Sequence, residues 1–284
     1  MKYQNLLIDG LNIYKMCYAT SQDLTTAGGR PTGAVYTTLA KIRSLCKLIQ
    51  TEDVTVLWDT NPSWRHLEYP KYKGTRIKED QPGMREQLEQ LKFYLSSFGI
   101  HQHSAPEMEA DDLAGAWFRH ADEENPVIFF SADKDWLQLV GDHTHLYRPA
   151  KKDVVMLDNF QSITGCRDPQ QFLAVKGIVG DAGDNVPGQA GIGERTAIKY
   201  LQEDINPNTV KYQRIVEWMD DPHGFANSFY LMNLREGNLS VPDLDTVPAD
   251  YDPEMVKYLC TENEYGSILK NVEQWCSVFP RAGQ

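Results

Sequence analysis

The chain has 284 residues, which is enough for one large domain or two small ones with a sizeable core. Its 41% hydrophobic and 24% charged residues are typical of a globular protein. No apolar run approaches the roughly 20 residues of a membrane-spanning helix. Asp9 and Asn12 interrupt the one apolar stretch near the N-terminus, which argues against a signal peptide. The composition therefore predicts a cytoplasmic protein without membrane contact.

The charge is unevenly distributed along the chain. A net charge of −12 argues against a generic nucleic-acid binder, whose surface is usually basic. Residues 64–78, however, carry five basic side chains against one acidic, and the acids lie elsewhere. These acids form either a solubilising surface or a site that needs cations. The five cysteines are scattered, with no C-x-x-C pair, so we expect reduced thiols and no zinc site.

Three short apolar runs each lead into an aspartate, at Asp9, Asp59 and Asp133. Runs this short and rich in β-branched or aromatic residues are typical of buried parallel strands. With helical patterns at 33–50 and 84–98 between them, they predict an α/β fold with a mostly parallel sheet flanked by helices. Ligands of such sheets bind beyond the carboxyl ends of the strands, so the three aspartates are expected to converge on one crevice.

Residues 60–83 are polar and basic and contain Pro62, Pro70, Gly74 and Pro82. Long connections in compact domains are usually functional or disordered. Because this stretch lies between two acidic motifs, we expect residues 60–90 to form a basic arch over the crevice. Such an arch would attract a phosphate backbone that bare acids would repel.

A further acidic group opens a helix after residue 109. Apolar residues at 110, 113, 114 and 117 follow the helical period, and Asp111 and Asp112 flank them. Acids in a first helical turn also complement the helix dipole, so a structural role is an alternative for each of them.

The character of the chain changes near residue 160. Asp168 and Pro169 predict the start of a helix that reaches about Val179. A glycine-rich turn follows, and a second helix is predicted from Glu194 to about Gln202. The remainder is predicted to be mostly helical, with residues 237–252 as a loop.

Nine acids are candidates for one metal site. Two carboxylates about 4 Å apart repel by about 4 kcal/mol at an effective dielectric of 20, so a converging group needs cations. Magnesium prefers oxygen ligands, and two such ions can activate a water and stabilise the leaving oxygen of a phosphodiester. The nine candidates are Asp9, Asp59, Glu109, Asp111, Asp112, Asp133, Asp135, Asp181 and Asp184.

Six stretches resemble motifs of the 5′-nuclease (flap endonuclease) family, and they follow one another along the chain in the order that the family has. The most specific is residues 176–197, which resembles the helix–three-turn–helix segment of that family. Residues 72–76 resemble the basic motif at the foot of the helical arch. The acidic motifs are matched by residues 8–10, 58–59, 109–112 and 131–135.

The resemblance implies a structure-specific 5′-nuclease with exonuclease and flap endonuclease activity in DNA replication or repair. Two or more Mg²⁺ ions, or Mn²⁺ in their place, would be held by the nine acids, and Asp133 would be one of the catalytic residues. Lys73 and Arg76 match residues that contact the scissile phosphate, and Tyr72 lies where an aromatic ring can stack on a base. The residues matching the duplex grip, where K⁺ is often held on backbone carbonyls, are Gly188, Gly191, Gly193, Arg195 and Thr196.

The resemblance also implies an organisation and partners. A PIN-like domain would cover residues 1–160, and a helical region would cover 161–284, with the helix–three-turn–helix at about 168–202. The expected partners are DNA with a 5′ flap, fork or 5′ end, RNA–DNA hybrids, and a replicative polymerase or single-strand-binding protein. We expect a stand-alone monomer in a bacterial cell or a phage-infected host.

Two alternatives remain on the sequence alone. A PIN-type ribonuclease shares the strand-end acids, but such proteins are usually shorter and lack the 176–197 segment. A branched-DNA-binding subunit without catalysis would be expected to lack metal acids, and none is missing here. An aspartate-nucleophile phosphatase is disfavoured because Leu11 stands where that chemistry needs an acid.

Overall fold

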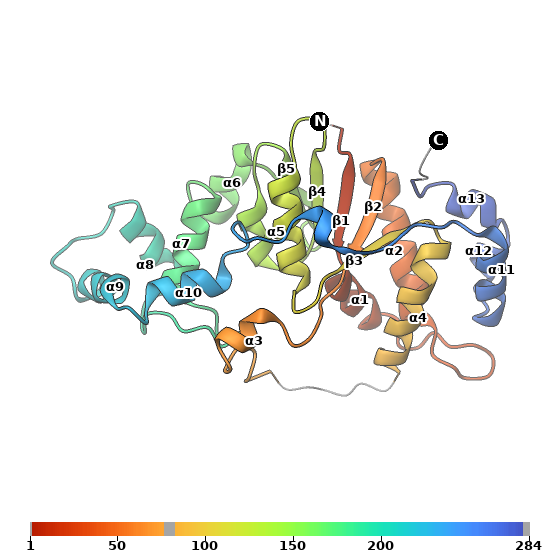
Figure 1. Ribbon diagram of the computed structural model, residues 1–284, viewed down its shortest axis with the longest axis horizontal. Coiled ribbons are helices and arrows are strands. Elements are labelled where there is room, and N and C mark those ends of the chain that lie inside the picture. The colour runs from red at the N-terminus through yellow and green to blue at the C-terminus, as the bar shows by residue number, and fades with distance from the viewer. Residues whose placement is uncertain (1, 77–82, 281–284) are drawn as a thin grey trace.

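The computed structural model describes residues 2–76 and 83–280, and it is built around one sheet (Figure 1). The strand order is β6-β5-β4-β1-β2-β3-β7. The five inner strands run parallel, and β6 and β7 are antiparallel strands at the two edges. This confirms the predicted fold class. The strands are β1 (Asn5–Asp9), β2 (Asp53–Leu57), β3 (His101–Ser104), β4 (Val127–Phe130), β5 (Thr144–Arg148), β6 (Asp153–Val155) and β7 (Asp245–Val247).

The strand order reverses beside β1. The chain moves outward from β1 through β2 to β3, and then returns to the other side of β1 with β4 and β5. Connections therefore leave β1 and β4 in opposite directions, which opens a crevice at their carboxyl ends. In Figure 1 this edge of the sheet faces downward, where α1 (Gly10–Tyr18) and α3 (Trp64–Glu68) lie.

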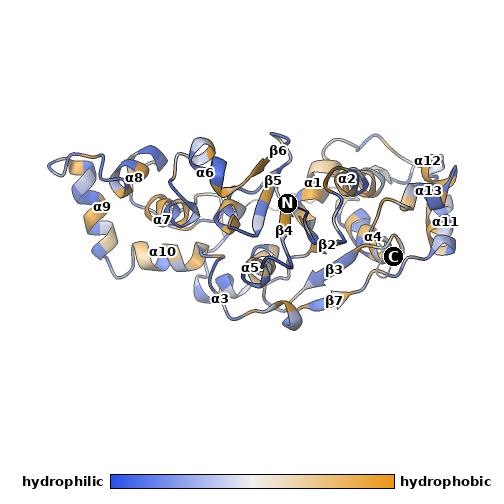
Figure 2. Ribbon diagram, turned by 90° about the horizontal axis from the view of Figure 1, so that it is seen from above, coloured by the Kyte–Doolittle hydropathy of each residue, from blue (hydrophilic) through white to orange (hydrophobic). Residues whose placement is uncertain are grey.

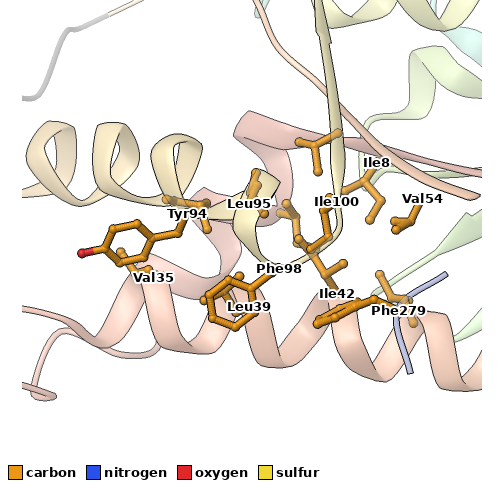
Figure 3. Packing of buried hydrophobic residues seen from close by; sticks show 14 of the residues in the cluster. Ile8, Val35, Leu39, Ile42, Val54, Tyr94, Leu95, Phe98, Ile100 and Phe279 are labelled. Carbon is orange, nitrogen blue, oxygen red and sulfur yellow. The ribbon is translucent and has the colours of Figure 1, made fainter. Parts of the chain in front are cut away.

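Helices cover both faces of the sheet, as the view from above shows (Figure 2). Because side chains alternate along a strand, Leu6 and Ile8 pack on one face and Leu7 on the other. The buried residues on the face of Leu6 and Ile8 form one hydrophobic core, called the first core below. Figure 3 shows part of it, where Ile8 lies near Ile42 and Ile100. That face is covered by α1, α2 (Gly33–Ile49) and α4 (Met84–Ser97), and the other by α5 (Ala110–His120) and the 3-10 helix η1 (Lys134–Leu139).

A helical region extends from one end of the sheet, at the left in Figure 1. Asp168 caps α7 by accepting a hydrogen bond from the Gln171 amide, 2.7 Å away, as the sequence predicts. Gly177 lets Phe225 of α10 approach closely, because a Cβ there would lie 2.6 Å from the phenyl ring. The helices are α6 (Leu157–Thr164), α7 (Pro169–Val179), α8 (Glu194–Leu201), α9 (Val210–Asp220) and α10 (Phe225–Met232).

The C-terminal residues do not stay with this helical region. The stretch 237–252, predicted as a loop, contains the 3-10 helix η2 (Val241–Asp243) and β7, which pairs with β3. Residues beyond it form part of the first core, and Tyr265 donates a hydrogen bond to the Thr32 carbonyl. Of the stretch 161–284, residues up to 232 thus belong to the helical region, whereas residues 245–279 pack with the sheet and its core. The terminal helices are α11 (Pro253–Glu262), α12 (Gly266–Leu269) and α13 (Val272–Cys276).

Within the described ranges, no helix combines the length and apolar character that crossing a bilayer requires.

Gly115 of α5 provides a test of this packing. A Cβ at that position would lie 2.1 Å from the Leu234 carbonyl oxygen, whereas one at Gly266 would meet nothing within 4 Å. Overpacking typically costs about 1–3 kcal/mol, so Gly115→Ala should lower the melting temperature by roughly 5 °C. Thermal unfolding with Gly266→Ala as the control measures this, and equal melting temperatures for the two variants would contradict the close packing.

Candidate active site

The carboxyl ends of β1 and β4 bring two of the predicted acids together. Asp9 is the last residue of β1 and is 8% exposed. Its side chain accepts hydrogen bonds from the Asn12 amide (3.0 Å) and the Ser131 hydroxyl (2.8 Å). Burial raises the pKa of Asp9 to about 7, and the charges of Asp59 and Asp133 add to the effect. The crevice that the sheet topology opens therefore holds carboxylates close enough to repel one another.

The start of α5 adds further acids to this group. Asp111 accepts a hydrogen bond from Trp136 Nε1 at 2.7 Å, and burial, followed by the charges of Asp133 and Asp9, raises its pKa well above the usual value. Asp59, just after β2, accepts a hydrogen bond from the Ala110 amide at 2.7 Å. Burial and the Glu109 charge raise the pKa of Asp59. The convergence predicted from the three strand ends is present, and it includes α5.

A second acidic group continues from η1 into the turn after α7. Asp135 is half-buried, and its desolvation raises its pKa to about 6, although Lys176 forms an ion pair with it. Lys176 Nζ also lies 3.0 Å from Asp181 Oδ2. Burial alone would raise the pKa of Asp181, but the Lys176 charge and hydrogen bond, together with hydrogen bonds from the Asp184 and Gly183 amides, lower it. Lys176 was not assigned a role from sequence. Its position five residues before Asp181 near the end of α7 was the available signal.

A cavity of about 640 Å³ adjoins this second group. It lies between the sheet and the helical region, and its walls include Asp133, Asp135, Lys176, Asp181 and Glu194. The second acidic group therefore has open space beside it into which a ligand can enter.

Lys73 and Arg76 face the acids rather than solvent alone. Lys73 Nζ lies 2.6 Å from Glu109 Oε1 and 3.9 Å from Asp184 Oδ2. Arg76 forms an ion pair with Asp184. The Lys73 backbone has a φ of 53°, in the left-handed region that is rare for lysine, and its amide donates to the Asp184 carbonyl at 2.8 Å. The structure therefore holds the two predicted catalytic cations against the acidic groups.

Tyr72 differs from the expectation of a stacking surface. Its side chain is 4% exposed, and its hydroxyl oxygen lies 2.9 Å from both Glu109 Oε2 and Asp184 Oδ2, so its single hydrogen is donated to one of the two acids at a time. The aromatic edge of His66 packs against its ring. In this structure Tyr72 links two acids and presents no face to a base. No local sequence pattern indicates these contacts, because both acids are distant from Tyr72 in sequence.

Arg65 and Asp112 also differ from the sequence interpretation. Arg65 was counted with the basic loop but is 2% exposed. Its two terminal nitrogens each lie 2.8 Å from an oxygen of Asp112, which also accepts a bond from Trp64 Nε1. Asp112 is thus neutralised by an arginine. The predicted arch includes residues 77–82, which lie outside the described residues.

Residues 180–193 form the predicted glycine-rich turn between α7 and α8, and this segment is called the hairpin below. Gly188 serves internal packing, because a Cβ there would lie 1.9 Å from the Val179 carbonyl oxygen. Gly191 has a φ of 76°, and a Cβ at Gly193 would meet nothing within 4 Å. Gly193 and Arg195 are exposed and Thr196 is half-buried at the start of α8. Backbone amides at this helix start can accept an anion.

The donor set suits a hard divalent cation. Among residues 2–76 and 83–280, no three acids, histidines or cysteines are already arranged as a set of metal ligands. Magnesium does not need such a cage, because it keeps several waters and takes one or two carboxylates. The carboxylates with raised pKa values supply oxygen donors and the repulsion that a cation relieves.

Known structures share this architecture. The T5 D15 protein, co-crystallised with metal ions, superposes with a TM-score of 0.66 at 23% identity, over 81% of this chain and 89% of that one. Flap endonuclease-1 from Methanococcus jannaschii gives a TM-score of 0.61 at 15% identity, over 98% and 93%. These likenesses establish the fold of the 5′-nucleases.

The family model described as the 5′-3′ exonuclease, N-terminal resolvase-like domain matches residues 4–165, and the chain belongs to this family. Thermostable DNA polymerase I of Thermus thermophilus is 34% identical over 205 residues, 70% of this chain and 24% of the polymerase. DNA polymerase I of Bacillus subtilis is 30% identical over 254 residues, 86% of this chain and 28% of the polymerase. The chain thus spans about a quarter of the length of these relatives.

The raised pKa of Asp9 predicts a pH dependence of stability. Between its ordinary value of 3.8 and about 7, the folded protein binds more protons at Asp9 than the unfolded chain does. Stability of the metal-free protein should therefore fall as pH rises through this window. Melting temperatures in EDTA should be on the order of 5 °C lower at pH 7.5 than at pH 5.5.

Asp9→Asn is the matched variant, since asparagine cannot ionise. It should show a smaller pH change than the wild type in the same thermal unfolding experiment. An identical change in both proteins would mean that Asp9 is ionised throughout the window.

Proposed function

We propose that this chain is a divalent-metal-dependent, structure-specific 5′-nuclease that hydrolyses phosphodiester bonds in branched or 5′-ended DNA. One observation carries the proposal: buried and half-buried carboxylates converge at the carboxyl ends of β1 and β4, where the strand order reverses, and Lys73 and Arg76 form ion pairs with the neighbouring acids Glu109 and Asp184. Anions alone would repel a phosphate, whereas anions with bound cations and neighbouring basic side chains would attract one.

Each of the two acidic groups would hold one metal ion. Asp9, Asp59, Glu109 and Asp111 would hold one Mg²⁺, and Asp133, Asp135 and Asp181 a second. When bound, these ions supply an activated water and charge neutralisation at the leaving oxygen. Mn²⁺, with its similar preference for oxygen ligands, is proposed as a substitute.

The basic side chains would act on the scissile phosphate. Lys73 Nζ, 2.6 Å from Glu109 in this structure, would exchange that carboxylate for a phosphate oxygen when the acids bind cations. Arg76 would make the same exchange from Asp184. A donor placed where charge develops in the transition state typically contributes roughly 100- to 1000-fold in rate. Tyr72 would keep Glu109 and Asp184 in register.

The helix–three-turn–helix would hold the duplex away from the cut. Amides at Gly193 and the start of α8 would contact backbone phosphates, with Arg195 adding charge. A K⁺ ion on the hairpin carbonyls belongs to the same proposal. The T5 D15 flap endonuclease was crystallised with DNA and metal ions, and the catalytic core of Rad2 with a DNA substrate. We propose duplex DNA with a 5′ flap or fork as the substrate, and RNA–DNA hybrids as a further one.

Asp133→Asn tests the proposed function. The variant should lose at least 100-fold in cleavage of a 5′-labelled flap in magnesium, because a proposed ligand of the second metal ion is removed. Asp23→Asn changes an exposed aspartate and should cleave at the wild-type rate. Single-turnover rates with both variants, on flap DNA and on single-stranded RNA, make the comparison.

The two substrates separate the alternatives. Cleavage of the RNA but not the flap would favour a PIN-type ribonuclease. Tight flap binding with no cleavage by the wild type in any divalent metal would favour a binding subunit, and an active Asp133→Asn would remove Asp133 from the site.

Gly193→Val tests the duplex grip. The free protein has space for the side chain, so the fold should be unaffected, while the valine would block approach of a phosphate. Affinity for duplex DNA, measured in Ca²⁺, should fall roughly tenfold for all sequences alike, because phosphate contacts carry no sequence information. Unchanged affinity, or a loss limited to some sequences, would show that the hairpin does not hold the backbone.

A further inference from the structure

The C-terminal end of α10 receives hydrogen bonds from two buried side chains, one in α3 and one in η1. Arg65 Nε donates to the Leu231 carbonyl at 2.7 Å, and Gln138 Nε2 donates to the Met232 carbonyl at 3.0 Å. Both side chains are almost completely buried, at 2% and 0% exposed. The last carbonyls of a helix have no partner within it, so side chains from elsewhere can bind them.

Arg65 uses its remaining nitrogens on the acids at the start of α5. Nη1 and Nη2 bind Asp112 in a bidentate arrangement, and Nη1 also lies 3.3 Å from Glu109 Oε2. The guanidinium packs over the Trp64 ring, 4.6 Å from its centre. A planar fork with fixed donor directions sets the orientation of both carboxylates, which a flexible ammonium group cannot do.

Gln138 makes the equivalent connection for the second acidic group. It lies in η1, whose first turn contains Asp135 and whose cap is Asp133. Its Oε1 accepts a hydrogen bond from the Leu234 amide at 2.8 Å. The side chain of Gln138 therefore binds the backbone both at the last residue of α10 and just after it. The position of η1, and of the acids on it, is therefore tied to the same helix end as Arg65.

The same helix is fixed to the hairpin that the proposed function assigns to DNA. Ser228 Oγ donates to the Pro187 carbonyl at 2.7 Å, and Phe225 fills the space above Gly177 of α7. One short helix therefore contacts the hairpin and the supports of both acidic groups.

We infer that Arg65 and Gln138 are positioning residues. By binding the end of α10, they hold the two acidic groups at a fixed position relative to each other. The inference rests on the proposed function, because it concerns how the acids bind metal. Loss of a group that orients metal ligands typically costs 10- to 100-fold in metal affinity. The affinity of the DNA-free protein for a divalent metal should therefore depend on Arg65, although Arg65 is buried and does not line the cavity beside the second acidic group.

The experiment is calorimetric titration of the DNA-free protein with Mn²⁺, together with melting temperature and duplex affinity in Ca²⁺. Arg65→Lys should weaken Mn²⁺ binding 10- to 100-fold and change duplex affinity less than threefold. Gln138→Met, which keeps the size of the side chain, should weaken Mn²⁺ binding in the same direction. Arg119→Lys is the control, because Arg119 binds the carbonyls of Leu234, Arg235 and Leu239 without an ion pair to a site acid.

The outcomes separate the explanations. A lower melting temperature with unchanged Mn²⁺ affinity in Arg65→Lys would reduce Arg65 to a structural role and overturn the inference. So would a loss of duplex affinity alone, or an equal loss of Mn²⁺ affinity in Arg119→Lys. If Arg65→Lys does not fold, Gln138→Met decides. A wild-type protein that binds no Mn²⁺ would instead contradict the proposed function itself.

Discussion

Repulsion among buried carboxylates is the constraint on which the rest of this structure depends. Asp9 is buried and Asp111 and Asp135 are half-buried beside other acids, and desolvation raises the pKa of each. Basic side chains offset part of this repulsion, because Lys73 and Lys176 each lie between two acids. Protonation reduces the remaining charge, and under the proposed function bound cations would reduce it further. Affinity for cations and sensitivity to pH would then have the same physical origin.

Several of these acids also hold the local structure. Asp9 caps α1, Asp133 caps η1, and Asp181 accepts the amides of the turn that follows it. Capping uses one oxygen of a carboxylate and leaves the other available to a neighbour. The structural and functional explanations of an aspartate at a strand end are therefore compatible, because both need the carboxylate at the start of the next element.

The sequence predicted the elements whose side chains alone indicate burial. The strands before Asp9, Asp59 and Asp133 were found from their apolar runs, and α7 from its cap. β3 and β7 were missed, because their residues are mostly polar and they are strands only through pairing with a neighbour. The burial of Arg65 and Tyr72 was missed for a related reason. Their partners Glu109 and Asp184 lie 37 to 112 residues away along the chain, so no local pattern reveals them.

The pairing of β7 with β3 has a consequence for folding during synthesis. Ser104 pairs with Asp245, so about half of the chain separates the two strands. Until residue 247 has left the ribosome, β3 is an edge strand with unpaired backbone groups, and the first core lacks α11 to α13. The helical region can form first, because its contacts are closer in sequence. The nuclease sheet is thus begun by the first residues made and completed by nearly the last.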